Sequence, residues 1–238
     1  MKWGTKFEAD YVNRLFRMVS AQLTLPHRFV CFTDDSKGID KRVEVFPIPE
    51  LYLPSDEPER CWKKLTMFSG ELANLSGPSL FLDLDIVIRD SIDDFFKVDG
   101  DFRIIKDWDF PNDIIGNSSV FRFNIGDHNY VLENFLQNRQ EIKMRFRNEQ
   151  AYLSHAINEH GNLKYWDLKW CVSFKRHCLR KWPVCYFKEP IEPVSAKIVV
   201  FHGKPTPNEA SCGYTGKLGF RYIKPTNWIR KYVSPDKP

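Results

Sequence analysis

The sequence has no hydrophobic run long enough to cross a membrane. No stretch approaches the about 18 to 20 consecutive apolar residues that a spanning helix requires. Residues 1–6 also lack the apolar core of a signal peptide. These absences predict a cytoplasmic chain, whose contact with the inner membrane surface would at most be peripheral.

Cysteines at metal-binding spacing are also missing. The chain has six cysteines and no Cys-x-x-Cys pair; they lie at positions 31, 61, 171, 178, 185 and 212. Three of them follow one another at intervals of seven residues, which is not a zinc-ligand spacing. Reduced thiols, several of them packed in the core, are therefore expected, and a zinc site is not.

The chain also lacks a strong overall excess of charge of one sign. The 35 Lys and Arg residues exceed the 31 Asp and Glu residues by a net charge of only +4, with a pI of about 8.6. A nucleic-acid-binding protein would show a dense basic stripe. The mild excess instead suits an anionic small ligand or an anionic acceptor surface, and no nucleic-acid partner is expected.

What the sequence does contain is an alternation of strand and helix patterns without repeats or low-complexity segments. Strands are predicted at 28–33, 43–46, 80–88, 102–106, 118–123 and 197–201, and helical segments at 10–23, 62–75, 92–96, 129–137 and 148–159. This order predicts one α/β domain with a three-layer architecture over residues 1–238. Residues 1–210 would form its core, and residues 211–238 an irregular, basic and aromatic tail.

Two carboxylates interrupt the most apolar of these strands. Asp83 and Asp85 lie between Leu-Phe-Leu and Ile-Val-Ile, where a buried strand is expected. A buried carboxylate without a partner is costly, so the pair requires a cation or many hydrogen bonds. In an extended strand the two side chains would point to the same side and could hold Mn²⁺ or Mg²⁺ with bound phosphates. Without that context, Asp-x-Asp is also common in surface turns.

A second polar group follows a later apolar strand. His202, Gly203 and Lys204 come directly after the strand at 197–201. A neutral imidazole binds Mn²⁺ well, a glycine allows the backbone to approach a phosphate, and a lysine adds positive charge. Taken alone, His202 is better explained as an ordinary histidine at a strand end, but together with Lys204 and the two acids it indicates a metal ligand.

These motifs resemble those of a known family in their order along nearly the whole chain. The matching segments are 3–7 (Trp-Gly-Thr-Lys-Phe), 11–15 (Tyr-Val-Asn-Arg-Leu), 29–34 (Phe-Val-Cys-Phe-Thr-Asp), 61–65 (Cys-Trp-Lys-Lys-Leu), 81–85 (Phe-Leu-Asp-Leu-Asp), 116–120 (Gly-Asn-Ser-Ser-Val), 148–152 (Asn-Glu-Gln-Ala-Tyr) and 201–205 (Phe-His-Gly-Lys-Pro). The chain is similar to nucleotide-sugar glycosyltransferases of the GT-A fold, in particular the glycogenin-like family 8 enzymes and related bacterial sugar transferases. The resemblance implies a Rossmann-like fold with a mostly parallel central sheet.

The resemblance also implies roles for particular residues. Asp83, Asp85 and His202 would hold the metal. Contacts with the donor nucleotide sugar would come from residues at several motifs, namely Lys6, Tyr11, Asn13, Lys64, Asn117, Ser118 and Lys204. Glu149 and Gln150 would form the catalytic pair near the reacting carbon, although Asn-Glu-Gln at a helix start is also good capping chemistry. The chain departs from the family in having Glu149 for Asp and in lacking the full glycine spacing after His202.

The expected activity is metal-dependent transfer of a sugar, with UDP-sugar as the expected donor and with retention of configuration. The acceptor would be a glycan, a lipid or a protein. A non-catalytic nucleotide-sugar-binding protein and a nucleotidyltransferase are the alternatives. A nucleotidyltransferase would be expected to have a Gly-rich triphosphate loop, and the sequence shows none near residue 1. The tail beyond residue 211 could contact an anionic lipid surface or simply pack on the domain.

Overall fold

The computed structural model describes residues 1–51, 60–216 and 222–233. Its first half contains α1 (Ala9–Gln22), β1 (Val30–Phe32), β2 (Glu44–Phe46), the 3₁₀ helix η1 (Arg60–Phe68), β3 (Pro78–Leu82), β4 (Ile86–Ile88), α2 (Asp94–Lys97), β5 (Phe102–Lys106) and β6 (Gly116–Asn124). Its second half contains α3 (Tyr130–Arg145), α4 (Glu149–Glu159), β7 (Leu163–Tyr165), β8 (Cys171–Ser173), the π-helical turn η2 (Phe174–Cys178), the 3₁₀ turn η3 (Val184–Tyr186), β9 (Ile198–Val200), α5 (Pro207–Cys212), β10 (Tyr214–Thr215), β11 (Tyr222–Ile223) and α6 (Asn227–Val233). The predicted α/β alternation is confirmed.

Helix α1 forms where the sequence repeats apolar residues at three- and four-residue steps. Val12, Leu15, Met18 and Val19 are buried on one side of it. The helix ends at Leu23, which is extended, and Pro26 follows shortly afterwards. Its apolar side packs against β4, so α1 covers the sheet beside the strand that follows the two acids.

The strands pair in several short sheets. One sheet has the order β3-β6-β5-β7, a second has the order β4-β9-β8, and β1 pairs with β2 in a third. β6 is antiparallel to both β3 and β5, and β9 is antiparallel to β4, whereas β5–β7, β8–β9 and β1–β2 are parallel. The sheets are thus more mixed than the mostly parallel sheet of the prediction, because consecutive neighbours such as β5 and β6 reverse the chain direction between them.

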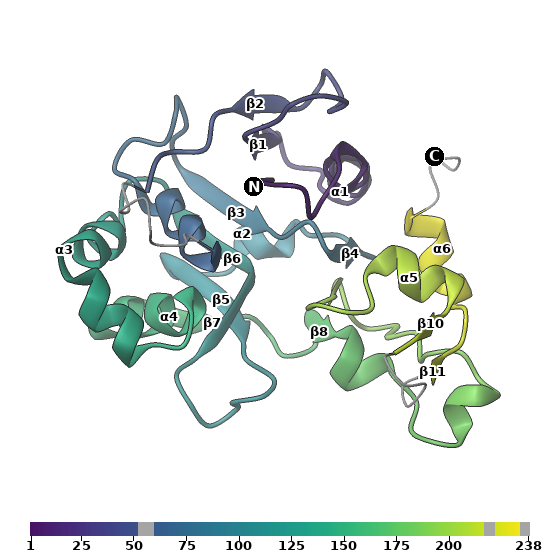
Figure 1. Cartoon of the computed structure of the whole chain (residues 1–238). Helices are drawn as coiled ribbons and strands as arrows, with labels where there is room; N and C mark the ends of the chain where they lie inside the picture. The colour runs from purple at the N-terminus through teal and green to yellow at the C-terminus, as the bar shows by residue number, and fades with distance from the viewer. Residues whose placement is uncertain (52–59, 217–221, 234–238) are drawn as a thin grey trace.

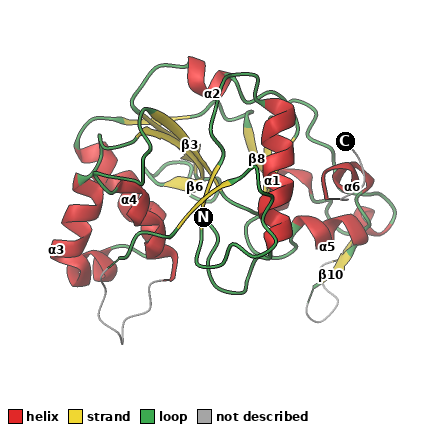
Figure 2. Cartoon of the chain, turned by 90° about the horizontal axis from the view of Figure 1, so that it is seen from above, coloured by secondary structure: helices red, strands yellow, loops and turns green. Residues whose placement is uncertain are grey.

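β6 separates two hydrophobic cores. Val120 packs with α1, β4, β8 and β9, whereas Phe121 and Phe123 pack with η1, α3 and α4. Every residue of β6 except Asn124 is buried, as expected for a strand covered on both faces. Figures 1 and 2 show α3 and α4 on one side of the β3-β6-β5-β7 sheet, with α1, α5 and α6 toward the opposite side. The result is the predicted three-layer arrangement.

Gly116 begins β6 at a position with no room for a side chain. A Cβ atom there would lie 2.6 Å from Cγ2 of Ile104 on β5. The neighbouring strand can approach closely only because residue 116 is glycine. Two residues further along β6, Ser118 contacts Glu149 and Gln150 in the first turn of α4.

Part of the predicted irregular tail is regular structure. Helix α6 buries Trp228 and Ile229 in the core that contains α1, and the Trp228 Nε1 donates to the carbonyl of Pro190 at 3.2 Å. The prediction of an irregular tail is therefore wrong for residues 222–233, because apolar and aromatic side chains of this segment pack into the core. The predicted tail residues 217–221 and 234–238 lie outside the described residues.

Other differences are smaller. The helix predicted at 62–75 is the shorter 3₁₀ helix η1, and α3 continues beyond the predicted residue 137, past a non-helical residue at Asn138. Near the N-terminus, a single parallel bridge joins Lys2 to Thr33. The described residues contain no helix with both the length and the apolarity needed to cross a bilayer.

Candidate active site

The strand predicted at 80–88 is broken at its two acids. β3 ends at Leu82, residues 84 and 85 form a turn, and β4 begins at Ile86 in a different sheet. The backbone N–H of Asp83 donates to Ser119 on β6, while the carbonyl of Asp85 accepts from Phe201 after β9. Asp83 and Asp85 therefore lie at the junction of two sheets and not along one extended strand, which corrects the prediction.

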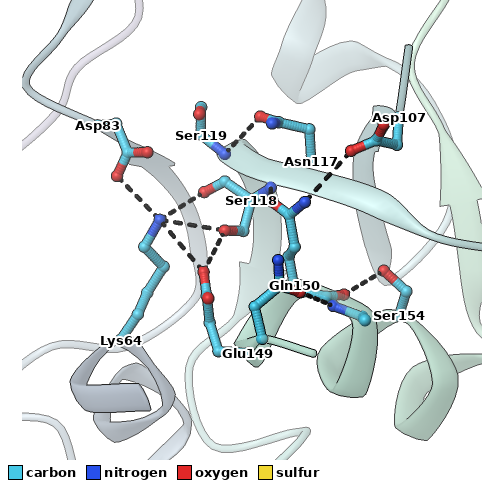
Figure 3. A network of polar contacts seen from close by, with 11 residues as sticks. Lys64, Asp83, Asp107, Asn117, Ser118, Ser119, Glu149, Gln150 and Ser154 are labelled. Atoms are coloured by element: carbon cyan, nitrogen blue, oxygen red, sulfur yellow. Dashed lines mark hydrogen bonds and ion pairs between the residues drawn. The ribbon is translucent and has the colours of Figure 1, made fainter. Parts of the chain in front are cut away.

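A buried lysine connects Asp83 to the start of α4. Lys64 Nζ lies 2.9 Å from Asp83 Oδ1 and donates to the carbonyl and to Oγ of Ser118, both at 3.1 Å. The same nitrogen lies 3.9 Å from Glu149 Oε1, which also accepts from Ser118 Oγ at 2.8 Å. Figure 3 shows how these side chains converge from η1, β6 and α4. The structure thus assembles four of the predicted site residues: Lys64, Asp83, Ser118 and Glu149.

Electrostatics explain why this lysine remains charged although it is only 6 % exposed. Burial lowers the pKa of an ammonium group, but here the negative charges of Asp83 and Glu149 outweigh it and raise the pKa of Lys64 above its usual value. Lys64 is therefore a fixed cation at the end of β3. It partly supplies the positive charge that the buried Glu149 and the half-buried Asp83 require.

The first turn of α4 carries the predicted catalytic pair. Asn148 caps the helix by accepting from the N–H of Ala151, as its sequence pattern predicts. Gln150 Nε2 donates to Asp107 Oδ2 at 3.2 Å, and Gln150 Oε1 accepts from the N–H of Ser118 at 3.4 Å. Both readings of the motif are thus compatible with the structure, since Asn148 caps the helix while the two residues after it face the site.

Asn117 uses its side-chain oxygen for a contact within its own strand. Its Oδ1 accepts from the N–H of Ser119 at 3.1 Å, two residues along the same strand. The Asn117 side chain is buried, and Figure 3 shows it next to Ser119. In this arrangement Asn117 supports the local backbone of β6.

Asp85 has a strongly perturbed pKa. Burial and, after it, the negative charge of Asp83 together raise the pKa of Asp85 to about 7, although Lys6 and Lys64 oppose the change. A carboxyl in this condition lacks sufficient positive charge nearby. The carboxylates of Asp83 and Asp85 are the hard oxygen ligands that Mn²⁺ and Mg²⁺ prefer.

His202, the third predicted metal ligand, is held elsewhere. Its Nε2 lies 2.7 Å from Ser173 Oγ, and its ring stacks on Trp108 with centroids 5.9 Å apart and planes at 17°. Burial, with a further contribution from Lys175, lowers the pKa of His202, so the ring is neutral. No cluster of three or more His, Cys, Asp or Glu residues in the described ranges is placed to hold a metal ion. The carboxylates fit a divalent ion, whereas Nε2 of His202 is occupied by Ser173.

The remaining predicted donor contacts lie around α1 and after β9. Lys6 is exposed and sits over the ring of Phe7, and Tyr11 packs on the same ring with centroids 4.9 Å apart. Asn13 holds the loop after β1 by bonding the backbone of Gly38 and Asp40. Both its amide nitrogen and its amide oxygen thus hold this loop.

Lys204 lies on the loop between β9 and α5. Its ammonium donates to Glu209, which raises the pKa of Lys204, and Glu209 also completes the capping box of α5 with Thr206. Gly203 just before it has a φ of +78°, a conformation that glycine adopts without strain. The loop therefore presents a charged, solvent-accessible lysine.

Two residues that join the separate groups were missed by the sequence analysis. Asp107 accepts from Gln150, and the adjacent Trp108 stacks on His202. They follow β5 as Asp83 follows β3, so polar residues at strand ends are the signal that could have identified them. Together they link the Lys64 network to the loop after β9.

Arg14 was also missed. It is fully buried, lies 4.4 Å from the ring centroid of Tyr11 and donates from Nη1 to Asn208 Oδ1 at 2.6 Å. Its Nε and Nη2 have no hydrogen-bond partner among the described residues. The position of Arg14 within the apolar pattern of α1 did not predict that its side chain would be buried.

Comparison with solved structures identifies the fold. A crystal structure of the galactosyltransferase LgtC in complex with donor and acceptor sugar analogues superposes with a TM-score of 0.57, over 84% of this chain and 85% of that chain, at 15% sequence identity. The chain has a GT-A fold. An active-site mutant of LgtC, in which glutamine is replaced by glutamate, superposes with a TM-score of 0.55, the same coverage and the same identity. No protein-family profile and no curated protein matches the sequence.

Proposed function

We propose that this chain is a metal-dependent glycosyltransferase that moves a sugar from a nucleoside-diphosphate sugar to an acceptor. The observation that carries the proposal is the pair Asp83 and Asp85 at the junction of two sheets, joined through Lys64 to the start of α4. The likeness to a galactosyltransferase structure with bound donor and acceptor analogues supports it. UDP is the proposed nucleotide, as the resemblance of the sequence motifs implies.

In the proposed reaction the bond between sugar and diphosphate breaks, and negative charge builds up on the leaving diphosphate. Asp83 and Asp85 would hold a Mn²⁺ or Mg²⁺ ion, which when bound offsets that charge. Lys204, exposed on the loop after β9, would bind the diphosphate directly once it releases Glu209. Loss of one such contact typically slows an enzyme by about 10²- to 10³-fold.

Glu149 and Gln150 have different surroundings and therefore different proposed tasks. Glu149 is buried, accepts from Ser118 and lies beside Lys64, so we assign it the positioning of that ammonium. Gln150 is half-buried and holds Asp107 and the N–H of Ser118, so its amide is the better candidate to face the sugar. Retention of configuration is proposed from the family resemblance alone.

The proposed acceptor is a glycan, a lipid or a protein, and the proposed location is the cytoplasm. Peripheral contact with the inner membrane remains a prediction. In the described part of the tail, Trp228 is buried against the core, which leaves Arg230 and Lys231 as its exposed charges. Such a surface would bind lipid through charge and not by inserting this aromatic ring.

The test is metal-dependent turnover of donor. Calorimetry with UDP, GDP, ADP and CMP, in Mn²⁺ and then in EDTA, identifies the nucleotide, and hydrolysis or transfer of its sugars is then measured. Asp85→Asn should lower turnover at least about 10²-fold, whereas Asp90→Asn, on an exposed loop, should leave it unchanged. Unchanged metal-dependent turnover in both Asp85→Asn and His202→Ala would contradict the proposal. Binding of nucleotide without turnover of any donor would favour a non-catalytic binding protein.

A further inference from the structure

A cavity adjoins the proposed donor site. Its volume is about 390 Å³, and it is lined mainly by residues 175–190 and 222–224. His202 forms part of its wall, while none of the residues of the Lys64 network lines it. The cavity therefore lies beside the place proposed for the leaving diphosphate and is distinct from the carboxylate pair.

The lining carries far more positive than negative charge. Five cationic side chains face the cavity, and a single carboxylate, Asp109, accompanies them; the cations are Lys175, Arg176, Arg180, Lys188 and Lys224. Asp109 is already paired with Arg176, at 2.7 Å. The excess of positive charge therefore persists within the cavity.

Two of these cations are anchored by neutral groups. Arg180 Nε donates to the carbonyl of Glu189 at 2.8 Å, and Lys224 Nζ donates to the carbonyl of Phe187 at 3.0 Å. A carbonyl fixes the position of a cation without cancelling its charge. The carboxylate of Glu189 accepts from the backbone N–H of Asn227 instead of turning into the cavity. The cavity is thus built to present positive charge to a ligand.

Aromatic side chains accompany the charges. Trp182 is 79 % exposed and Tyr186 is 46 % exposed, which is unusual for large rings. Tyr186 stacks on Tyr222 with centroids 5.1 Å apart and planes at 3°. Solvent-exposed aromatic rings beside hydrogen-bond donors can stack on the apolar face of a sugar.

We propose that this cavity is the acceptor site and that it takes an acidic saccharide, one that bears carboxylate or phosphate groups. The inference rests on the proposed function, because it places the acceptor across His202 from the donor. The rings would stack on sugar units while the cations bind their acidic groups.

The test compares acidic with neutral probes by calorimetry at low and at moderate salt. The α-1,4-linked trimer of galacturonate is measured against the neutral α-1,4-linked galactose trimer, and galactose 6-phosphate against galactose. The first pair reports carboxylate recognition and the second reports phosphate recognition. We expect each preferred acidic probe to bind at least about tenfold more tightly than its neutral partner, and salt to weaken that binding.

Variants assign the binding to the cavity. Arg176 and Lys188 are exposed, so Lys188→Gln and the double variant Arg176→Gln/Lys188→Gln should fold normally. Each substitution should weaken the acidic probe by about tenfold. Lys97→Gln, which removes an exposed lysine paired with Asp94 outside the cavity, should leave probe binding unchanged.

Three outcomes would overturn the inference: equal affinity for acidic and neutral probes, no binding of either, or loss of UDP binding in the cavity variants together with displacement of the acidic probe by UDP. The last would make the cavity part of the donor site. Donor turnover measured on the same preparation separates the two proposals. Turnover without preference for acidic probes contradicts only the acceptor inference, whereas acidic-probe binding without turnover contradicts the proposed function and, with it, the acceptor role of the cavity.

Discussion

The ammonium of Lys64 lies 2.9 Å from Asp83 Oδ1, and this single contact joins η1 to the end of β3. The same ammonium reaches Glu149 at 3.9 Å on α4. Three segments that are distant in the sequence therefore share one buried cation (Figure 3). Because buried charges are stable only in pairs, each member of this set depends on the others.

Replacement of Lys64 should strongly destabilise the fold. Lys64→Met leaves Asp83 and Glu149 without their cation, and removal of one partner of a buried ion pair costs about 3 to 5 kcal/mol. Urea unfolding followed by circular dichroism measures the loss in unfolding free energy.

Two further variants make that result specific. The double variant Lys64→Met/Glu149→Gln should be less destabilised than Lys64→Met, because one unpaired carboxylate has been removed. Lys97→Met, at an exposed surface pair, should change stability by less than about 1 kcal/mol. A loss below about 1 kcal/mol for Lys64→Met would contradict the buried-cation interpretation.

Gln150→Glu should create a repulsion that depends on pH. The substitution replaces the amide that donates to Asp107 with a second carboxylate, so at pH 8 we expect a loss of roughly 1 to 3 kcal/mol. The pKa of the new carboxyl pair would be higher in the folded than in the unfolded state, so the folded variant binds more protons. The variant should therefore retain its stability relative to the wild type at low pH. It should lose that stability as pH rises through the folded pKa.

Thermal unfolding of Gln150→Glu at pH 5 and pH 8 measures this effect. Addition of Asp107→Asn should restore stability at pH 8, because an amide can again donate to a carboxylate across the same contact. An equal shift in unfolding temperature at both pH values would show that repulsion with Asp107 is not the cause.

Asn208→Ala should lower the unfolding free energy, because it removes a hydrogen-bond acceptor from the buried Arg14. Asn208 accepts from Nη1 of Arg14, whose Nε and Nη2 already have no partner in the described part of the chain. Loss of this acceptor should cost about 1 to 3 kcal/mol in unfolding free energy. In an Arg14→Met background the same substitution should cost much less, and Asn158→Ala, on the exposed side of α4, serves as the matched control. Equal losses in both backgrounds would argue against the contact.

Thiol reactivity should follow burial. All six cysteines are free; Cys212 is exposed, whereas Cys171 and Cys178 are buried. Burial raises the pKa of Cys178 to about 12 and raises that of Cys171 as well, so neither forms the reactive thiolate at pH 8. Alkylation of the native protein at pH 8, mapped by mass spectrometry, should modify Cys212 first and the two buried thiols only after denaturation. Equal labelling of Cys171 and Cys212 before denaturation would contradict this order.

The helices and strands of the core were predictable because their signals are local. The three- and four-residue spacing of Val12, Leu15 and Val19 forms α1, and the Asn148 cap begins α4 where the sequence predicts. The GT-A fold was predictable from the order of short motifs. Strand lengths and pairing directions were less accessible, since they depend on which neighbour each strand meets.

The order of the amino acids is enough to predict that acids follow β3 and that a histidine and a lysine follow β9, because an apolar run ends at those residues. The break of the strand at Asp83 and Asp85 and the pairing of Lys64 with Asp83 depend on contacts that exist only in the folded chain. Likewise, nothing local places Trp108 on His202 or gathers the cations of residues 175–190 with Lys224 around one cavity. Hydrophobic spacing acts between near neighbours in the chain, whereas charge pairing and cavity lining require side chains from distant segments to meet at distances of a few ångströms.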